Sequence, residues 1–141
     1  INELIRPALK NGKTVVCDRY FDATLVYQGF ARGLSIELIR QLHQLLFDDL
    51  KPDVTLLLDL SPQVGLKRAW QQLNNGQRSG DESRFEAEAV AFHEKVRAGY
   101  LELARLEPER FRIIDAAQTQ NQVFAAMRKI VSSFLKQSQN D

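Results

Sequence analysis

Short continuous apolar runs alternate along the chain with longer stretches of helical periodicity. The runs lie at 14–17, 54–59 and 111–114, and none of them shows the polar alternation of a half-exposed strand. They therefore predict three strands that are covered on both faces. An aspartate ends or directly follows each run, and these residues are Asp18, Asp59 and Asp115.

Apolar residues three and four positions apart predict helices around these strands. Asn11-Gly12 ends the first helix, over about 1–10, and Ser35 is placed to cap the helix over 36–50. Ser61-Pro62 opens the next helix, a long one ends before Pro108, and a last one follows the third strand. The apolar stripe of 36–50 is wide, so we expect this helix to be deeply buried or packed against a partner subunit.

Strands that alternate with helices predict an α/β fold with a doubly wound parallel sheet, as a single domain over 1–141. Ligands of such sheets bind beyond the carboxyl ends of the strands, which is where the three aspartates are expected. The first helical pattern begins without a capping residue. We therefore expect Ile1 to lie inside a helix and the sequence to be the C-terminal part of a longer chain.

The bulk composition adds few constraints. Hydrophobic residues make up 44% and charged residues 26%, and the formal charge is +1, which gives no reason to expect a nucleic-acid polymer or an anionic membrane as the main partner. No apolar run approaches the roughly 20 residues of a membrane span. The single cysteine, Cys17, fits a reducing compartment, so we expect a cytoplasmic protein.

Asp18-Arg19 directly follows the first predicted strand. A carboxylate there can hold Mg²⁺ through water, and an adjacent guanidinium can grip a phosphate in bidentate fashion. Together they would serve phosphoryl transfer, in which positioning and charge neutralisation carry most of the catalysis. A structural salt bridge at the strand end is the alternative.

The stretch TLVYQG, residues 24–29, places Thr24 and Gln28 four positions apart, so both face the same way on one helical turn. A hydroxyl and an amide beside Tyr27 suit the edge of a base and its sugar. In the alternative interpretation, Tyr27 packs in the core and Gln28-Gly29 ends a turn.

A polar tract within about 71–84 is rich in Gly, Asn and Ser and is bordered by basic residues. Lys67 and Arg68 precede the tract, Arg78 lies within it, and Arg84 begins the helix that follows. Such a segment is typical of a lid that closes over a polyphosphate. It is also typical of a mobile surface loop with scattered charge.

Four stretches, taken in order, resemble bacterial thymidylate kinases: CDRYFDATLVYQGFARG, KPDVTLLLDLSPQVGLKRA, SRFE, and YLELA followed by IIDA. The resemblance is collinear over nearly the whole chain. Its strongest markers are DRY, YQG eight residues after the Asp-Arg pair, and PDVTLLLD. The resemblance implies a P-loop nucleoside monophosphate kinase fold and an enzyme that uses Mg²⁺ and ATP to convert dTMP to dTDP.

The same resemblance implies roles for individual residues. Arg19 would contact the phosphates of dTMP and ATP, with Asp18 near the magnesium ion. The dTMP-binding residues would be Asp18, Arg19, Tyr20, Thr24, Tyr27 and Gln28. The ATP and lid residues would be Lys67, Arg68, Arg78, Arg84, Ala116 and Ala117, and the catalytic residues would be Arg19, Arg78 and Arg84. The family is homodimeric, which suits the apolar helix at 36–50.

The sequence departs from the family pattern in three ways. Ala23 stands where the family often has serine, and the tract before SRFE is longer than usual. The phosphate-binding motif G-x-x-x-x-G-K-[ST] does not occur in the 141 residues. We therefore expect the first strand, the P-loop and the first helix of the fold to be missing, which would leave a gap beside buried strands and a chain without kinase activity alone.

Two other functions remain open on the sequence alone. One is another deoxynucleoside or nucleotide kinase. The other is a non-catalytic, dimerising nucleotide-binding fragment that uses the 36–50 helix as its interface.

Overall fold

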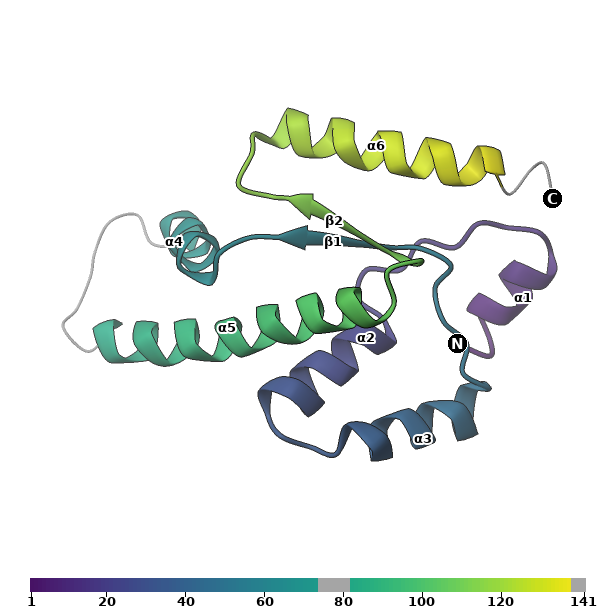
Figure 1. Ribbon diagram of the computed structural model, residues 1–141, viewed down its shortest axis with the longest axis horizontal. Coiled ribbons are helices and arrows are strands. Elements are labelled where there is room, and N and C mark those ends of the chain that lie inside the picture. The colour runs from purple at the N-terminus through teal and green to yellow at the C-terminus, as the bar shows by residue number, and fades with distance from the viewer. Residues whose placement is uncertain (74–81, 138–141) are drawn as a thin grey trace. The chain divides into compact units, whose positions relative to one another are not determined.

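The computed structural model describes residues 1–73 and 82–137, without the side chains of 72–73, 82–87 and 137. The chain forms two compact units, Ile1–Pro52 and Asp53–Asp141. The elements, labelled in Figure 1, are α1 (Ile5–Lys10), α2 (Phe21–Thr24), the π-helix η1 (Leu25–Ala31), α3 (Ile36–Phe47), β1 (Thr55–Asp59), α4 (Pro62–Leu73), α5 (Glu82–Leu106), β2 (Phe111–Asp115) and α6 (Gln120–Gln137). That residues 1–141 make a single domain stays a prediction.

The second unit is built on two parallel strands. β1 and β2 pair in register, with Leu57 opposite Ile113 and Asp59 opposite Asp115. Helices α5 and α6 flank the strands and both contact β2 (Figure 1). These findings confirm the parallel strands predicted at 54–59 and 111–114, the α/β architecture, and the meeting of two aspartates at the carboxyl edge.

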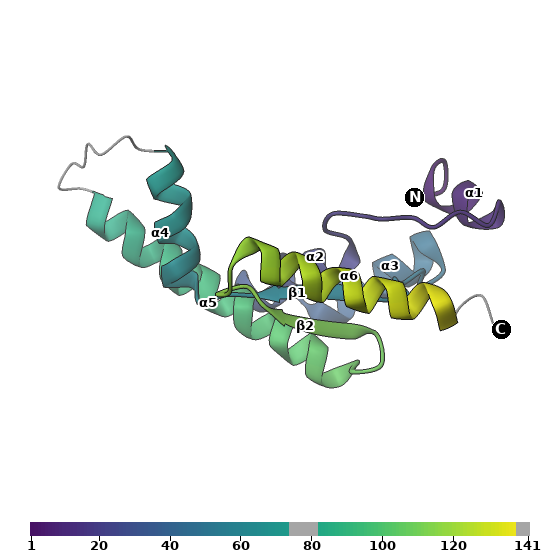
Figure 2. The same ribbon diagram turned by 90° about the horizontal axis from the view of Figure 1, so that it is seen from above.

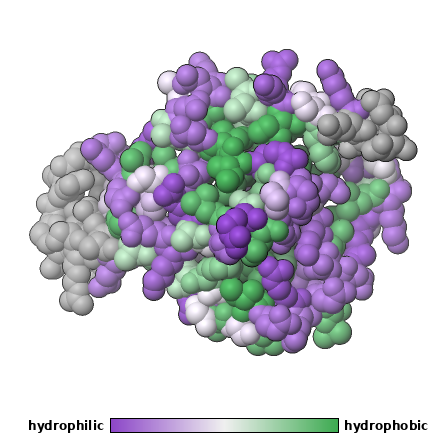
Figure 3. All heavy atoms as spheres, in the orientation of Figure 1, coloured by the Kyte–Doolittle hydropathy of each residue, from purple (hydrophilic) through white to green (hydrophobic). Residues whose placement is uncertain are grey.

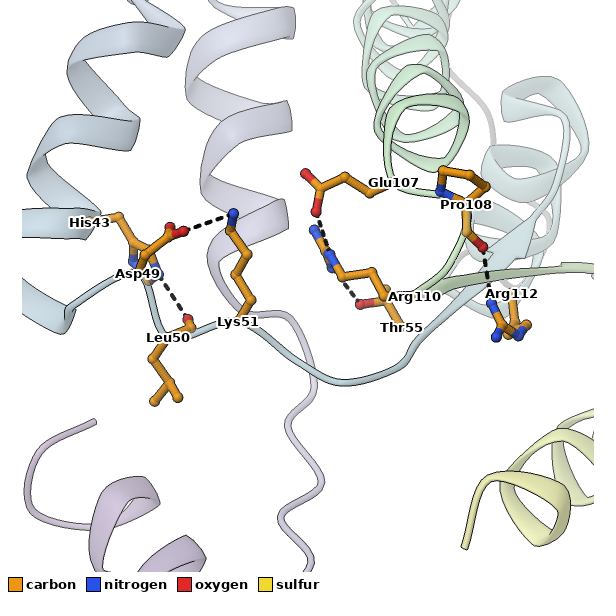
Figure 4. A network of polar contacts seen from close by, with 9 residues as sticks. All are labelled: His43, Asp49, Leu50, Lys51, Thr55, Glu107, Pro108, Arg110 and Arg112. Atoms are coloured by element: carbon orange, nitrogen blue, oxygen red, sulfur yellow. Dashed lines mark hydrogen bonds and ion pairs between the residues drawn. The ribbon is translucent and has the colours of Figure 1, made fainter. Parts of the chain in front are cut away.

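Polar contacts fix the amino ends of these strands. Arg110 is only 6% exposed, and its guanidinium donates to Glu107 at 2.6 Å and to the Thr55 hydroxyl at 3.0 Å (Figure 4). The Thr55 amide donates to the Arg110 carbonyl at 2.8 Å. The buried positive charge is therefore paired, and the same contacts set the register from which Asp59 and Asp115 follow.

Helix α4 begins alongside the middle of α5 (Figure 2). Pro62 is the first residue of α4, and α5 ends at Leu106, before Pro108, both as predicted. No helix in the described parts of the chain has the length and apolarity that a membrane span requires.

The first unit is helical and contains an unusual π-helix. Ser35 caps α3, since its hydroxyl accepts from the Leu38 amide at 3.1 Å, as predicted. His43 of α3 is buried, stacks on Phe21 with ring centroids 3.7 Å apart, and bonds the Leu50 carbonyl at 2.9 Å (Figure 4). This side chain therefore joins α3 to α2 and to the segment that follows α3.

The predicted strand at 14–17 is wrong. Residues 13–17 have no regular secondary structure and are mostly exposed, and the Val16 side chain is 94% exposed. Among the described residues, only β1 and β2 pair as strands. A lone extended segment leaves its backbone groups to water and buries no apolar face, so the β-branched run is not enough to make a strand.

Deep burial of the helix predicted at 36–50 is also wrong. His43 is the buried residue of α3, and four of its leucines are exposed. They are Leu38, Leu42, Leu45 and Leu46. Figure 3 shows apolar atoms at the surface among the polar ones. Within the chain, the apolar stripe of α3 is only partly covered, which leaves a partner subunit as the alternative.

Gly29 sets how closely η1 approaches α3. A Cβ atom at this position would lie 2.8 Å from Cγ1 of Ile36. We expect Gly29→Ala to lower the free energy of unfolding of the first unit by about 1–3 kcal/mol, because α3 must move or strain. Urea unfolding followed by circular dichroism measures this change. Gly65→Ala, whose Cβ would make an ordinary 3.5 Å contact, is the control; equal effects of the two variants would contradict the argument.

Candidate active site

The first unit contains an open pocket of about 450 Å³. Its polar lining comes from Arg19, Thr24 and Gln28, and Tyr20 and His43 line it with their rings. The remaining lining residues are apolar: Ile1, Phe21, Leu34, Ile39, Leu42, Leu46 and Phe47. A concave, mainly apolar surface with a few polar groups at one side is the usual form of a small-molecule site.

Arg19 lies at the pocket in a special backbone conformation. Its φ is +61°, a left-handed value that costs energy for a residue other than glycine and often marks a functional position. The guanidinium lies 4.3 Å from the centroid of the Tyr27 ring, in a cation–π contact. No ion pair joins Arg19 to a carboxylate among the described residues, so the salt bridge considered for Asp18-Arg19 does not form there.

Thr24 and Gln28 both line the pocket, so the expectation that they face the same way is confirmed. Thr24 ends α2, and Gln28 lies in the π-helix that continues it. The Gln28 Oε1 atom accepts from Arg32 at 3.0 Å, which leaves the amide NH₂ as the donor of that side chain. A π-helical turn inside a helix is often found at functional sites.

Tyr20 contributes a buried polar atom to the pocket region. Its hydroxyl is buried and has no hydrogen-bond partner in the described parts of the chain. Burial, helped by nearby Cys17, raises the pKa of Tyr20 above its usual value of 10.0, while Arg6 lowers it slightly. The phenol therefore stays protonated at neutral pH and has a hydrogen-bond donor to offer.

The structure separates Asp18 from this pocket wall. Asp18 is exposed and is not among the lining residues. Among the described residues, no group of three or more His, Cys, Asp or Glu side chains is placed to hold a metal ion. Any ion at Asp18 would need ligands from a substrate or from water.

In the second unit, polar groups gather at the carboxyl edge of the strands. Asp59 accepts two hydrogen bonds from Arg97 of α5, at 2.6 and 2.7 Å. The Arg97 hydrogen bond is the main cause that holds the pKa of Asp59 below its usual 3.8, and the Arg97 charge adds to it, against the effect of burial. Sequence reasoning named Asp59 but missed Arg97, because 38 residues separate them and no local pattern connects them.

Three of the residues predicted for ATP come together at the same edge. Arg68 of α4 donates to the carbonyl of Ala116 at 3.1 Å and to that of Ala117 at 3.4 Å. Lys67 lies beside Arg68 on α4 and is exposed. Arg78 lies outside the described residues; Arg84 is in α5, but its side chain is outside the description.

Asp115 has a local structural role at this edge. Its carboxylate accepts from the Ala117 amide at 2.8 Å and from the Gln118 side chain at 3.4 Å. These contacts form a turn directly after β2 and shape the segment that Arg68 contacts. Sequence reasoning placed Asp115 at the strand end correctly but gave no role to this turn.

Parallel strands, connecting helices and polar groups at the carboxyl edge define the class of α/β proteins that bind ligands beyond their strand ends. Within that class, the chain belongs to the thymidylate kinase family, whose model matches residues 1–127. The fold of that family is the P-loop nucleoside monophosphate kinase fold.

Named relatives agree with this assignment. The chain is 52% identical over 134 residues to a thymidylate kinase of Desulfosudis oleivorans, covering 92% of this chain and 63% of that protein. It is 56% identical over 124 residues to one of Desulforapulum autotrophicum, covering 88% of this chain and 55% of that protein. It is 48% identical over 132 residues to one of Oleidesulfovibrio alaskensis, covering 94% and 62%. The chain thus spans 55–63% of the length of these relatives.

The Asp59–Arg97 pair makes stability depend on pH. Since the folded pKa of Asp59 lies below its ordinary 3.8, the pair stabilises the fold above that pH, and this stabilisation is lost as the pH falls below it. We expect Asp59→Asn to lower the free energy of unfolding by about 0.5–1 kcal/mol at pH 7, a value suited to a partly exposed pair.

The fluorescence of Trp70, the single tryptophan, reports on urea unfolding of the second unit. The difference between wild type and Asp59→Asn should shrink as the pH drops below about 4. Glu102→Gln, at the exposed Glu102–Arg105 pair of α5, is the matched control and should change little because water screens it. If the difference in unfolding free energy between wild type and Asp59→Asn does not vary with pH, the stabilising role of the ionised Asp59 is contradicted.

Proposed function

We propose that the protein is a thymidylate kinase, which transfers the γ-phosphoryl group of ATP to the 5′-phosphate of dTMP and so forms dTDP. The proposal is supported by membership of the family and by the names of the relatives. The observation that carries it in the structure is Arg19, held on the Tyr27 ring beside a pocket that Thr24 and Gln28 also line. A cation, a hydroxyl and an amide at one apolar pocket fit a nucleoside monophosphate.

The polar side chains of this pocket, and some of its apolar ones, suit parts of dTMP. The Arg19 guanidinium would bind the phosphate, because its planar donors match two phosphate oxygens and it makes no ion pair with a carboxylate among the described residues. The Gln28 amide and the Thr24 hydroxyl would bind the base edge and the sugar, and the Tyr20 ring would pack against the ligand. Apolar lining such as Leu42 and Phe47 suits a base that carries a methyl group.

ATP would bind at the carboxyl edge of the second unit, as the general rule for parallel sheets predicts. The meeting of Arg68 with Ala116 and Ala117 supports this placement. Lys67, Arg78 and Arg84 would add positive charge near the phosphates by analogy with the family. One arginine that stabilises the transferring phosphoryl group can raise the rate by about 10³–10⁵.

Magnesium fits this arrangement through Asp18. Mg²⁺ binds one or two carboxylates together with waters and substrate phosphates, so it does not require a cage of protein ligands. Asp18 is exposed and directly precedes Arg19 in the sequence, so its carboxylate would bind the ion through water or a substrate phosphate, from outside the residues that line the pocket. The ion would neutralise charge on the phosphates, while Arg19 orients the acceptor.

The catalytic unit also needs a phosphate-binding loop. The 141 residues contain no G-x-x-x-x-G-K-[ST] motif, whose backbone amides and lysine cradle ATP phosphates. We propose that the first strand, P-loop and first helix of the fold lie outside these residues, and that these residues alone do not phosphorylate dTMP. The exposed apolar segment at 13–17, which pairs with no described strand, supports this proposal.

A homodimer through α3 is the proposed assembly. The exposed leucines of α3 form an apolar surface. Its exposure to water is unfavourable, and the same helix of a second copy can cover it. The proposal places the protein in the cytoplasm, since it would act on ATP and dTMP.

A substrate panel tests the proposed activity. The product of the complete open reading frame is assayed with ATP and either dTMP, thymidine or dCMP, and ADP formation is followed by a coupled assay. We expect the highest kcat/KM with dTMP. A clear preference for thymidine or dCMP would identify the protein as a different nucleoside or nucleotide kinase. Binding of dTMP without any turnover would favour a non-catalytic role.

Arg19→Met tests the role of the pocket cation. We expect KM for dTMP to rise about 10- to 100-fold and kcat to fall by about 10³, because a charge-assisted phosphate contact is lost in both ground and transition states. Lys10→Met removes an exposed positive charge from the same unit and should leave both constants within twofold. If Arg19→Met and Lys10→Met give similar kinetics, Arg19 does not bind the substrate phosphate.

Leu45→Glu tests the α3 interface. Leu45 is 78% exposed in the single chain, so a glutamate there should not disturb folding, whereas it would place a charge inside a dimer contact. Light scattering after size exclusion should show twice the single-chain mass for wild type and the single-chain mass for the variant. Leu106→Glu, at an exposed leucine of α5, is the control and should stay dimeric; a monomeric wild type rejects the interface.

A further inference from the structure

Arg97 makes the best-formed ion pair at the carboxyl edge of the strands. The pair is bidentate, with Nε and Nη2 of Arg97 at 2.6 and 2.7 Å from the two Asp59 oxygens. Arg97 comes from the middle of α5, and Asp59 is the last residue of β1. Bidentate geometry fixes both the position and the orientation of the carboxylate, which a single contact does not.

Through Asp59 the pair reaches the segment that follows β2. The Asp59 carbonyl accepts from the Ala116 amide at 2.9 Å, while the Ala116 and Ala117 carbonyls accept from Arg68. Arg97 and Arg68 therefore act on the same short segment from two helices, α5 and α4. The segment is positioned on one side by the end of β1 and on the other by a guanidinium.

The pair also neutralises Asp59, one of the two aspartates at this edge; the carboxylate of the other, Asp115, accepts from amide groups. An unpaired aspartate at a strand end would repel an incoming polyphosphate, and it would do so most strongly at low ionic strength. The side chains of Arg97 and Asp59 are 42% and 22% exposed, so the pair lies close enough to solvent to affect an arriving ligand. Glu94, one turn earlier on α5, accepts from Gln63 at 2.7 Å and thus ties α4 to α5 beside the pair.

We propose that Arg97 is a positioning residue for ATP: it neutralises Asp59 and, through Asp59, holds the 116–117 segment in place. Arg97 need not touch the nucleotide for this role. The inference rests on the proposed function, because it assumes that ATP binds at this edge. Arg97 is not one of the ATP and lid residues that the family resemblance implies.

Two measurements test the proposal on the same set of variants. Amide hydrogen exchange at Ala116 in the 141-residue chain reports whether Arg97 holds the segment. Steady-state kinetics of the complete open-reading-frame product report whether this matters for ATP. The variants are Arg97→Gln, Arg97→Lys, the double variant Asp59→Asn with Arg97→Gln, and Arg105→Gln as the matched control at another bidentate pair of α5.

For Arg97→Gln we expect faster exchange at Ala116, a KM for ATP about tenfold higher, and a KM for dTMP within twofold of wild type. The increase in KM for ATP should be larger at low salt. The double variant has no unpaired Asp59 carboxylate, so its KM for ATP should return close to the wild-type value, while hydrogen exchange at Ala116 should stay fast. Arg97→Lys keeps the charge and should fall between Arg97→Gln and wild type, and Arg105→Gln should match wild type in both measurements.

The positioning role is rejected if exchange at Ala116 is unchanged in Arg97→Gln. The role in ATP binding is rejected if both KM values rise together, or if Arg105→Gln gives the same change as Arg97→Gln. If the wild-type product does not phosphorylate dTMP, the proposed function fails, and exchange at Ala116 still decides whether Arg97 holds the segment.

Discussion

The proposed site depends on one contact, in which a guanidinium stacks on an aromatic ring and is not paired with a carboxylate. Arg19 adopts a left-handed backbone conformation, and its charge lies over Tyr27. The left-handed conformation costs a non-glycine residue about 1–2 kcal/mol, and a cation–π contact offsets part of that cost. The ring holds the side chain at the pocket without neutralising it, so the positive charge remains available to an anion.

The second unit uses arginine in the opposite way. Arg97 is paired with Asp59, and Arg68 donates to two backbone carbonyls. These side chains shape the carboxyl edge, and the pairing with Asp59 removes a negative charge that would oppose nucleotide phosphates. Under the proposed function, the first unit would present a cation for the acceptor phosphate, and the second would arrange a backbone segment for the donor nucleotide. Each of these features lies within its own unit.

Local patterns predicted the elements whose stability is local. The Ser35 cap and the Pro62 start agree with the structure, because capping and backbone φ act over a few residues. The apolar run ending at Asp59 also agrees, and it forms a strand because β2 pairs with it. The segment at 14–17 failed because a strand needs a neighbour, and its own residues do not show whether one is present. The prediction that Thr24 and Gln28 face the same way was correct, but the sequence pattern did not show that Gln28 lies in a π-helix.

Contacts between distant residues were the part that sequence reasoning could not reach. Arg97 and Asp59, like His43 and Phe21, come together only through the packing of helices. Composition gave no sign of either pair. Local motifs and the family resemblance gave the candidate residues, and the structure added contacts such as the one between Arg97 and Asp59.

The most direct test of the central claim is NMR of the complete open-reading-frame product with ¹⁵N-labelled arginine side chains, titrated with dTMP and with thymidine. We expect dTMP to shift the Arg19 Nε resonance and thymidine to leave it nearly unchanged, while both ligands shift the Gln28 side-chain amide. An Arg19 resonance that does not respond to dTMP, or that responds equally to thymidine, would show that this guanidinium does not bind the phosphate and would contradict the account.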